Sequence, residues 1–188
     1  MTLMPSLKTG FVFSTICLLA LTGVSPPHAT AQAVSYTSDK VEYTLEVPSR
    51  LWKLIAEPDE NHQSPEWVYG DRLNGYLRIH KEAMGPNLTM SEFARAYQSQ
   101  RLGFLPDYID VGKDIDKEER FAGHLTGVML SYEFTQTGKR MLGRSYYLQA
   151  DSHTVYVLLF TGLRDKMGSI RNQTDQIARS FRLKSADK

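Results

Sequence analysis

Residues 140–181, near the C-terminus, constrain the possible folds of this chain more than any other stretch. Residues 153–161 (HTVYVLLFT) are rich in β-branched and aromatic side chains and are bounded by turn residues. This composition is typical of a strand that is covered on both faces. From Arg164 onward, apolar side chains recur at steps of three and four residues, which predicts an amphipathic helix on the sheet. Its expected buried positions are Met167, Ile170, Thr174, Ile177, Ala178 and Phe181.

A hairpin is expected to join this central strand to the strand before it. The preceding residues alternate apolar side chains with small or polar ones, and residues 151–152 (Asp-Ser) suit a two-residue turn. Counting outward from that turn places Leu148 opposite Val155 and Tyr146 opposite Val157. The pairs would form one continuous apolar face.

Three further segments complete an α+β pattern in a single domain. Residues 41–47 and 125–135 alternate apolar and polar side chains, which predicts strands with one buried face. Residues 90–102 have helical periodicity, and Thr89 together with Glu92 forms the signature of a capping box. The strand at 125–135 turns back into residue 140, so three antiparallel strands are expected in succession.

The clearest candidate for a functional surface is a hairpin over residues 66–82. Its centre is predicted at Asn74-Gly75, because both positions of a type I′ turn need positive φ. Counting outward pairs Leu73 with Tyr76, Asp71 with Arg78, Tyr69 with His80, and Trp67 with Glu82. The candidate binding surface on one face of the sheet is then Trp67, Tyr69, Asp71, Tyr76, Arg78, His80 and Glu82.

Two interpretations of this hairpin face remain open. Exposed aromatic and arginine side chains are typical anchors of protein interfaces, which favours a binding surface. The alternative is a solvated sheet face on which Asp71 and Arg78 form an ordinary cross-strand ion pair, contributing roughly 0.2–1 kcal/mol.

Residues 1–33 are typical of a secretory signal peptide. Lys8 is their one formal charge, residues 11–24 are apolar, and small residues follow up to Ala33. An apolar run of about fourteen residues is short for a membrane span, although an uncleaved anchor helix is the alternative. We therefore expect cleavage near Ala33 and a single domain over residues 34–188, located in the periplasm or outside the cell.

Charge and cysteine content exclude several classes of function. The single cysteine, Cys17, lies in the expected signal peptide, so the mature domain has neither disulfides nor thiolate chemistry. Without Lys8 the chain keeps 21 of its 22 basic residues, which equals its 21 acidic residues. This balance gives no electrostatic case for a nucleic acid or an anionic membrane as partner.

Motifs for catalysis or cofactor binding are weak. Residues 138–145 (GKRMLGRS) resemble a phosphate-binding loop with Arg144 in place of lysine, but the expected context is a strand reached from a hairpin. The acidic residues of 114–118 lack the spacing of an EF-hand. No serine-hydrolase elbow, zinc-protease pair or paired-cysteine motif occurs, so we expect no catalytic residue, metal or cofactor.

An enzymatic alternative remains open. A metal-dependent hydrolase would require a site assembled from distant residues, such as Asp71, His80, Glu82 and His124. His80 and Glu82 share a strand face, but zinc sites need at least three protein ligands. A further alternative is a carrier that holds a lipid or small apolar ligand between helix and sheet.

Several stretches together resemble the superfamily of PsbP, an extrinsic photosystem II protein, and the related Ran-binding Mog proteins and bacterial envelope domains. The resemblance rests on residues 43–48 (YTLEVP) followed by Trp52, on residues 142–147 (LGRSYY) and 155–158 (VYVL), and on residues 177–181 (IARSF). It spans nearly the whole mature chain. Such a family implies an α/β/α sandwich, with helices on the faces of an antiparallel sheet, and a role in binding proteins or assisting assembly.

From these observations we expect an exported, non-enzymatic binding or assembly-assisting protein of the cell envelope. Its partner would be a protein, with no nucleic acid and no stable membrane insertion after signal cleavage. A monomer is expected.

Overall fold

The computed structural model describes residues 33–60, 64–111, 119–121 and 125–184, with the backbone alone for 119–121. The expected signal peptide therefore lies, apart from Ala33, outside the described residues, and its cleavage stays a prediction. The acidic run at 114–118 and His124 also lie outside them. Within the described part of the chain, no helix is long and apolar enough to cross a membrane.

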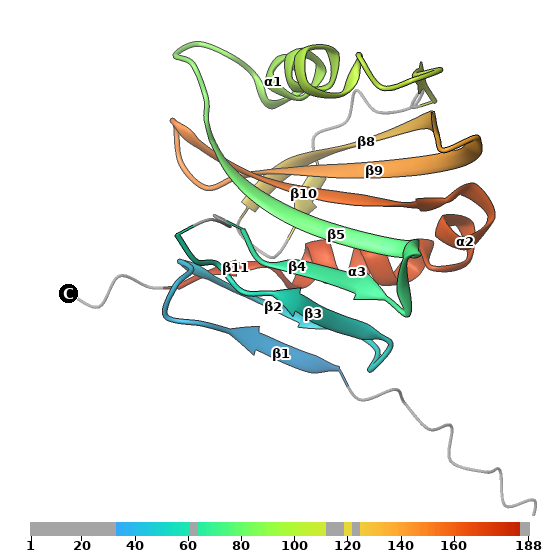
Figure 1. Cartoon of the computed structure of the whole chain (residues 1–188). Helices are drawn as coiled ribbons and strands as arrows, with labels where there is room; N and C mark the ends of the chain where they lie inside the picture. The colour runs from blue at the N-terminus through green and yellow to red at the C-terminus, as the bar shows by residue number, and fades with distance from the viewer. Residues whose placement is uncertain (1–32, 61–63, 112–118, 122–124, 185–188) are drawn as a thin grey trace, which may run out of the picture. The chain divides into compact units, whose positions relative to one another are not determined.

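A large antiparallel sheet forms the middle layer (Figure 1). Counting the described residues only, it has eight strands. Seven follow the order β3 (Trp52–Ala56), β4 (Glu66–Tyr69), β5 (Asp71–Ala83), β10 (Thr154–Leu163), β9 (Lys139–Gln149), β8 (Leu125–Gln136) and β6 (Ile109–Asp110), and β7 (Glu119–Phe121) also pairs with β8. β10 lies inside the sheet, between β5 and β9, as the apolar composition of residues 153–161 predicts.

Helices cover both faces of this sheet. Helix α1 (Met90–Tyr97) and the π-helical turn η1 (Gln98–Leu102) pack on one face. Helices α2 (Arg164–Ser169) and α3 (Arg171–Ser180) pack on the other, together with a small sheet of β1 (Val34–Thr37), β2 (Tyr43–Val47) and β11 (Arg182–Leu183). The predicted α+β fold, an antiparallel sheet with helices on its faces, is confirmed.

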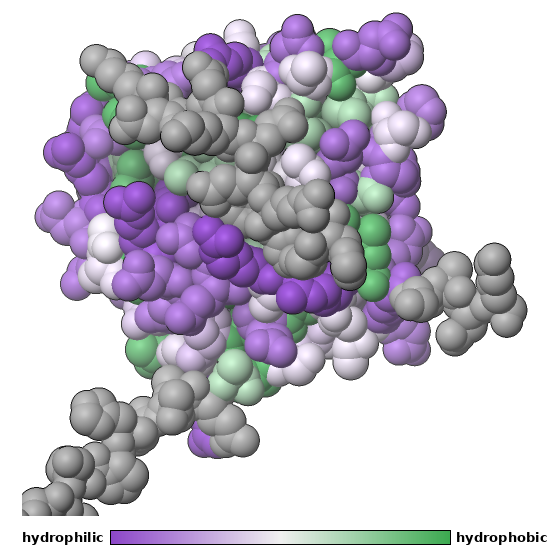
Figure 2. Space-filling view, turned by 180° about the vertical axis from the view of Figure 1, so that it is seen from behind, coloured by the Kyte–Doolittle hydropathy of each residue, from purple (hydrophilic) through white to green (hydrophobic). Residues whose placement is uncertain are grey.

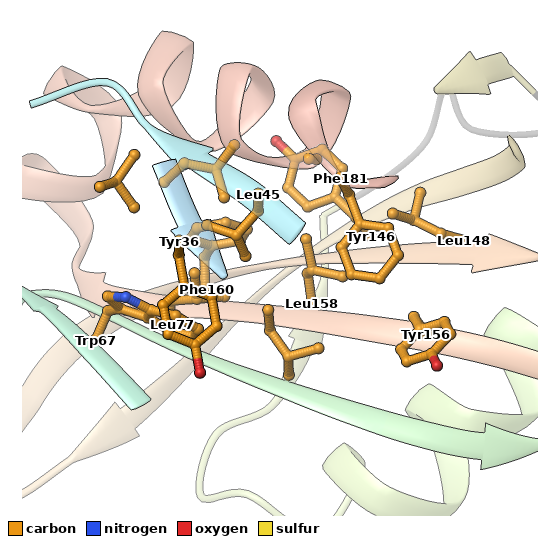
Figure 3. Close-up of a cluster of buried hydrophobic side chains, with 14 of the residues drawn as sticks. Tyr36, Leu45, Trp67, Leu77, Tyr146, Leu148, Tyr156, Leu158, Phe160 and Phe181 are labelled. Atoms are coloured by element: carbon orange, nitrogen blue, oxygen red, sulfur yellow. The ribbon is translucent and has the colours of Figure 1, made fainter. Parts of the chain in front are cut away.

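The main core lies between the large sheet and the layer of α3 and the small sheet (Figure 3). Alternation along β10 sends Tyr156, Leu158 and Phe160 into this core, while Val155 and Val157 contact α1 on the opposite face. All five side chains are at most 3% exposed. Burying each one contributes about 1.5–3 kcal/mol, so β10 is stabilised from both sides.

The closing helix is divided into two segments at Ile170, where φ is −103° and ψ is 9°. Gly168 and Ser169 precede the break, and both residue types have low helix propensity. The expected apolar stripe is nevertheless confirmed. Its six members are each at most 2% exposed: Met167, Ile170, Thr174, Ile177, Ala178 and Phe181.

The helix expected over residues 90–102 begins as predicted with a capping box. The Thr89 hydroxyl accepts a hydrogen bond from the Glu92 backbone N–H at 3.2 Å, and a Glu92 carboxylate oxygen accepts from the Thr89 N–H at 2.9 Å. The α-helix ends at Tyr97, and η1 carries the chain on to Leu102.

The prediction of a two-residue turn at residues 151–152 is wrong, because the loop also contains His153. The backbone N–H of Ala150 donates to the carbonyl oxygen of Thr154 at 2.9 Å. Within the loop, the Asp151 carboxylate accepts from the His153 N–H at 2.8 Å, which stabilises the longer turn.

The longer loop shifts the pairing of β9 and β10 by one residue. Leu148 pairs with Tyr156, and Tyr146 pairs with Leu158, each one residue beyond the expected partner. The residues of each pair still share one apolar face, because both members lie in the main core.

A buried arginine on β9 fixes α3 to the sheet. Arg144 is 3% exposed and donates to the Arg171 carbonyl oxygen at 3.0 Å, to the Thr174 hydroxyl at 2.7 Å and to the Asp175 carboxylate at 3.0 Å. The Tyr146 hydroxyl also donates to Asp175. The side chain that made residues 138–145 resemble a phosphate loop is therefore structural, and these residues do enter a strand.

The neighbouring tyrosine, Tyr147, points to the opposite face, towards α1. It is fully buried, and burial raises the pKa of its hydroxyl, which stays protonated. This hydroxyl, like the Ser145 hydroxyl and the Gln98 amide nitrogen, has no well-formed hydrogen bond within the described part of the chain.

The adjacent tyrosines provide a matched test of this packing. Tyr146→Phe should lower the free energy of unfolding by about 1.5–3 kcal/mol, because it removes a hydrogen bond to a charged carboxylate. Tyr147→Phe should change stability by less than about 1 kcal/mol in either direction, because its buried hydroxyl makes no well-formed hydrogen bond. Urea unfolding of both variants measures the difference, and equal losses would contradict the assignment.

Candidate functional site

The hairpin that the sequence analysis selected has a different turn. Asn74-Gly75 is not a type I′ turn; the chain reverses at Gly70, whose φ is +71°. Glu66 pairs with Arg78, and Trp67 pairs with Leu77. The expected register is therefore wrong, and because the shift is odd, β4 presents its opposite face.

Two interactions explain this correction. The Asp71 carboxylate accepts from the backbone N–H groups of Leu73 and Asn74, both at 2.8 Å, and so stabilises the start of β5. Gly75 is needed for close packing: a Cβ atom there would lie 2.9 Å from the Cδ1 of Ile170. Gly75 therefore lies within a closely packed strand, although the sequence Asn74-Gly75 is typical of a turn.

The seven predicted site residues consequently separate into three groups. Trp67 is 2% exposed in the main core, and Tyr69 packs against that core. Asp71 is exposed at the turn. The remaining four, which alternate along β5 on the face opposite the main core, are Tyr76, Arg78, His80 and Glu82.

A cleft of about 560 Å³ opens on that opposite face. Its floor is formed by Leu159 of β10 and by Tyr132 and Phe134 of β8. Another part of the lining is formed by Leu102, at the end of η1, and by Leu105 and Pro106, which follow it. The polar groups at the rim include Thr135, Gln136, Thr137 and Thr161.

The floor of the cleft is held in place by aromatic stacking on a glycine. The Tyr132 ring lies 5.8 Å from the rings of both Tyr108 and Phe134, with interplanar angles of 27°. It also covers Gly143, its partner on β9, so closely that a Cβ there would be 2.1 Å from the ring. A larger residue at 143 would therefore displace the floor.

We call Arg72, Tyr76 and Arg78 the arginine end of the cleft. Arg78 donates to one carboxylate oxygen of Glu66 at 2.6 Å and to the Tyr76 hydroxyl at 2.8 Å. Arg72 contacts the other Glu66 oxygen at 3.4 Å. The guanidinium carbons lie 5.1 Å (Arg72) and 5.6 Å (Arg78) from the Tyr76 ring centre, within the range of cation–π attraction.

Burial and charge set the protonation of these groups. Burial alone would raise the pKa of Glu66, but hydrogen bonds from Tyr76 and Arg78 outweigh it and lower the pKa. Burial raises the pKa of Tyr76, and the adjacent carboxylate raises it further. The pKa of His80 is lowered by burial and by the positive charges of Arg78 and Arg101.

The metal-site alternative receives no geometric support from the described residues, which contain no cluster of three potential ligands. Asp71 and His80 are separated by nine residues of extended strand, roughly 30 Å of chain. His124 lies outside the described residues, so the four-residue set cannot be assembled here. No cofactor is placed by these side chains.

Sequence reasoning missed Arg72 of the arginine end and the carboxylate that both arginines contact. Glu66 and Arg72 were not selected, although Gly70 followed by Asp71 is itself a turn signal. A turn at that glycine alone does not place Glu66 opposite Arg78, because the pairing also requires the register shift between Val68 and Tyr69, which no sequence signal marks. The floor residues had no comparable signal, because Tyr132 and Phe134 have the ordinary alternation of a buried strand.

The face seen from behind in Figure 2 is mostly hydrophilic, with small and separate hydrophobic areas. On the whole described surface, the most exposed large apolar side chain is Phe104, at 76%. In sequence it lies between Leu102 and Leu105, which both line the cleft, but Phe104 itself does not line it. An exposed aromatic ring is thus carried by the same segment as two lining residues.

Comparison with protein-family models finds no match, and comparison with curated proteins finds none. Solved structures do match. LpqN of Mycobacterium tuberculosis, described as involved in cell envelope biogenesis, aligns with a TM-score of 0.56 and 15% identity over 81% of this chain and 91% of that one.

Two further structures have the same fold. The Ran-binding protein Mog1p of Saccharomyces cerevisiae aligns with a TM-score of 0.58 and 8% identity, over 81% of this chain and 96% of that one. PsbP (CyanoP) of Synechocystis sp. PCC 6803 aligns with a TM-score of 0.51 and 12% identity, over 86% and 98%. The chain has the PsbP/Mog fold, as the sequence resemblance predicts.

Glu66 should make stability depend on pH. Its pKa is lowered in the folded state, so its stabilisation is complete above the unfolded-state value of about 4.3 and is lost as the pH falls towards the folded-state value. Glu66→Gln should cost about 1–3 kcal/mol in urea unfolding at pH 7. At pH 3 the gap from wild type should narrow.

A control variant for this test is Glu46→Gln, on the exposed side of β2. It should leave the free energy of unfolding within about 0.5 kcal/mol of wild type at pH 7. A gap between wild type and Glu66→Gln that stays constant down to pH 3 would contradict the assignment.

Gly143→Ala should destabilise the protein by about 1–3 kcal/mol, because the added methyl group overlaps the Tyr132 ring. Gly168→Ala, in α2, is the matched control: no atom lies within 4 Å of its Cβ position, so stability should be unchanged or higher. Thermal unfolding followed by circular dichroism compares the two. An unaltered melting temperature for Gly143→Ala would show that the floor is looser than described.

Proposed function

We propose that the chain is an exported, non-enzymatic binding protein that docks a segment of a protein partner in the cleft. The observation that carries this proposal is the cleft itself, with the arginine end at its lining and the exposed Phe104 next in sequence to the lining residue Leu105. Tyrosine, tryptophan and arginine dominate the energetics of protein interfaces, and they act most strongly around desolvated pockets.

The exposed ring of Phe104 favours a protein partner. Aromatic side chains bury about 150–250 Å² each when they are covered. Phe104 is 76% exposed in the free chain, so a docked partner surface would remove most of this apolar area from water. A small ligand lying in the cleft would leave a protruding ring uncovered.

The chemistry of the lining supports binding in preference to catalysis. Among the described residues that line the cleft, none is an aspartate, glutamate, histidine, cysteine or lysine. General acid–base catalysis depends mainly on these residue types, and a threonine or tyrosine nucleophile needs an adjacent base to activate it. The arginines, hydroxyls and aromatic rings that are present can orient a partner through hydrogen bonds and packing.

The solved structures support this proposal only at the level of fold. LpqN is described as involved in cell envelope biogenesis, and Mog1p as Ran-binding. Of the two descriptions, that of Mog1p names the binding of another protein. An envelope location for this chain rests on the signal peptide expected over residues 1–33.

A second candidate function is the carriage of a small ligand. The cleft volume of about 560 Å³ lies within the roughly 300–1,000 Å³ range of small-molecule sites. Native mass spectrometry of the protein purified from its own host would detect such a ligand as a discrete added mass. Its loss on acid unfolding would distinguish a bound molecule from a covalent modification.

Photo-crosslinking in the host envelope tests protein binding at the cleft. A photoreactive amino acid at Leu105 should give a defined crosslinked species, and Phe104→Ser should reduce its yield at least fivefold by removing the exposed anchor. The matched control is Leu183→Ser, which alters another exposed apolar residue on the small sheet. It should leave the yield unchanged.

Two outcomes would contradict the proposed function. One is the absence of any crosslink from Leu105 under conditions in which the protein is folded and exported. The other is an equal loss of yield in Phe104→Ser and Leu183→Ser, because this would show that the contact is not specific to the cleft.

A further inference from the structure

We propose that the arginine end of the cleft recognises a carboxylate, so that the docked segment is a peptide with an acidic group next to apolar side chains. The inference rests on the proposed function, because it specifies the partner's chemistry at the same cleft. It is carried by the balance of charge, the unused bonding capacity of Arg72 and the composition of the neighbouring floor and rim.

The arginine end has a surplus of positive charge. Two guanidinium groups, from Arg72 and Arg78, converge on the single carboxylate of Glu66. One pair of opposite charges is neutral, so the second guanidinium leaves a net charge of +1 beside the apolar floor. Farther along the same face, Arg101 and Glu82 carry opposite charges and do not change this balance.

The two arginines differ in how fully they are bonded. Arg78 makes close hydrogen bonds to Glu66 and Tyr76, and its side chain is 42% exposed. Within the described part of the chain, the one polar contact of the Arg72 guanidinium is with Glu66 at 3.4 Å, which is long for a hydrogen bond, and its side chain is 64% exposed. A guanidinium has five N–H donors, so Arg72 retains donors that face solvent at the cleft.

The arrangement is already fixed before a ligand arrives. The Glu66 side chain is only 8% exposed, and both guanidinium groups lie against the Tyr76 ring. A planar guanidinium held in this way binds a carboxylate with little further loss of conformational freedom.

A carboxylate fits this end better than a phosphate. A single negative charge neutralises the surplus charge of +1. A phosphate dianion would bring an additional negative charge next to Leu159, Tyr132 and Phe134. Among the described residues that line the cleft, Arg72 and Arg78 are the only cations, so this additional charge would have no partner. Placing an unpaired charge against apolar side chains is unfavourable.

The rim favours a peptide over a simple hydrocarbon chain. Thr135, Gln136, Thr137 and Thr161 offer hydroxyl and amide groups along the cleft. These groups can pair with the backbone N–H and C=O groups of a peptide, which need hydrogen-bond partners when they lose water. A fatty acid has no such groups along its chain.

Matched synthetic peptides test the inference. The probe is acetyl-Ala-Leu-Glu-Phe-Ala-amide, and its control replaces the glutamate with glutamine. Titration of the ¹⁵N-labelled full mature chain, followed by two-dimensional NMR, should show shifts in residues 72–78 and 132–137. We expect the acidic peptide to bind at least about fivefold more tightly than the control, with the preference weakening at higher salt.

Variants assign the preference to the arginine end. Arg72→Gln, at an exposed side chain, should reduce the acidic preference to less than twofold while the control peptide binds as before. Lys166→Gln on α2 removes an exposed charge elsewhere and should leave the preference intact. A third peptide with a free C-terminal carboxylate and no glutamate distinguishes a terminal from a side-chain carboxylate.

Three outcomes would overturn the inference. Equal affinity for the acidic and control peptides would show that the cleft does not recognise the carboxylate. The proposed docking of a protein partner, which crosslinking tests, would be unaffected by this outcome. An acidic preference that survives Arg72→Gln would place the recognition elsewhere. Shifts caused by dodecanoate, with none caused by either peptide, would identify an amphiphile site in place of a peptide site.

Discussion

The two layers of this protein depend on one buried charge. The side chain of Arg144 extends from β9 into the layer of α3. There it donates hydrogen bonds to a carbonyl oxygen, a hydroxyl and a carboxylate, all from that helix. The Arg144 side chain is only 4% exposed, and leaving a buried charge without its partner typically costs about 3–5 kcal/mol. Hydrophobic packing supplies most of the adhesion between α3 and the sheet, but this set of directional bonds fixes the position at which the helix lies.

The same strand serves the opposite face through the preceding residue. Gly143 and Arg144 point to opposite sides of β9: the arginine binds α3, and the glycine leaves room for the Tyr132 ring. Tyr132 then carries the stack that forms the cleft floor. Two consecutive residues thus link the helix layer to the floor of the cleft.

Much of the fold could be predicted from side-chain periodicity. The doubly buried β10, the alternation of β8, the capping box at Thr89 and the six-residue stripe of the closing helix all depend on local patterns, and each is confirmed. The prediction of these features stays correct even when the predicted register between strands is wrong. The buried face follows from the alternation within one strand or helix and not from the identity of the neighbouring strand.

The candidate site was harder to predict because it depends on register. Asn74-Gly75 has the composition of a type I′ turn, but Gly75 is used for packing beneath Ile170. The chain instead has positive φ at both residues of the β8–β9 turn, Thr137 and Gly138, a pair with a weaker sequence signal. Local composition cannot show which glycine a crowded core requires. The sequence therefore predicted the wrong face of β4 for the core.

The turn at Gly70 also determines what kinds of length change this region can accept. Surface turns usually tolerate insertions, because little packs on them. Here an added or deleted residue that the register shift between Val68 and Tyr69 does not absorb exchanges the sides of every residue on β4 relative to β5. A change of one would bring Glu66 into the core and expose Trp67, whereas a change of two would preserve both faces. Among natural relatives, the length of this short loop should therefore vary in even steps, a rule of parity imposed on a surface segment by the core beneath it.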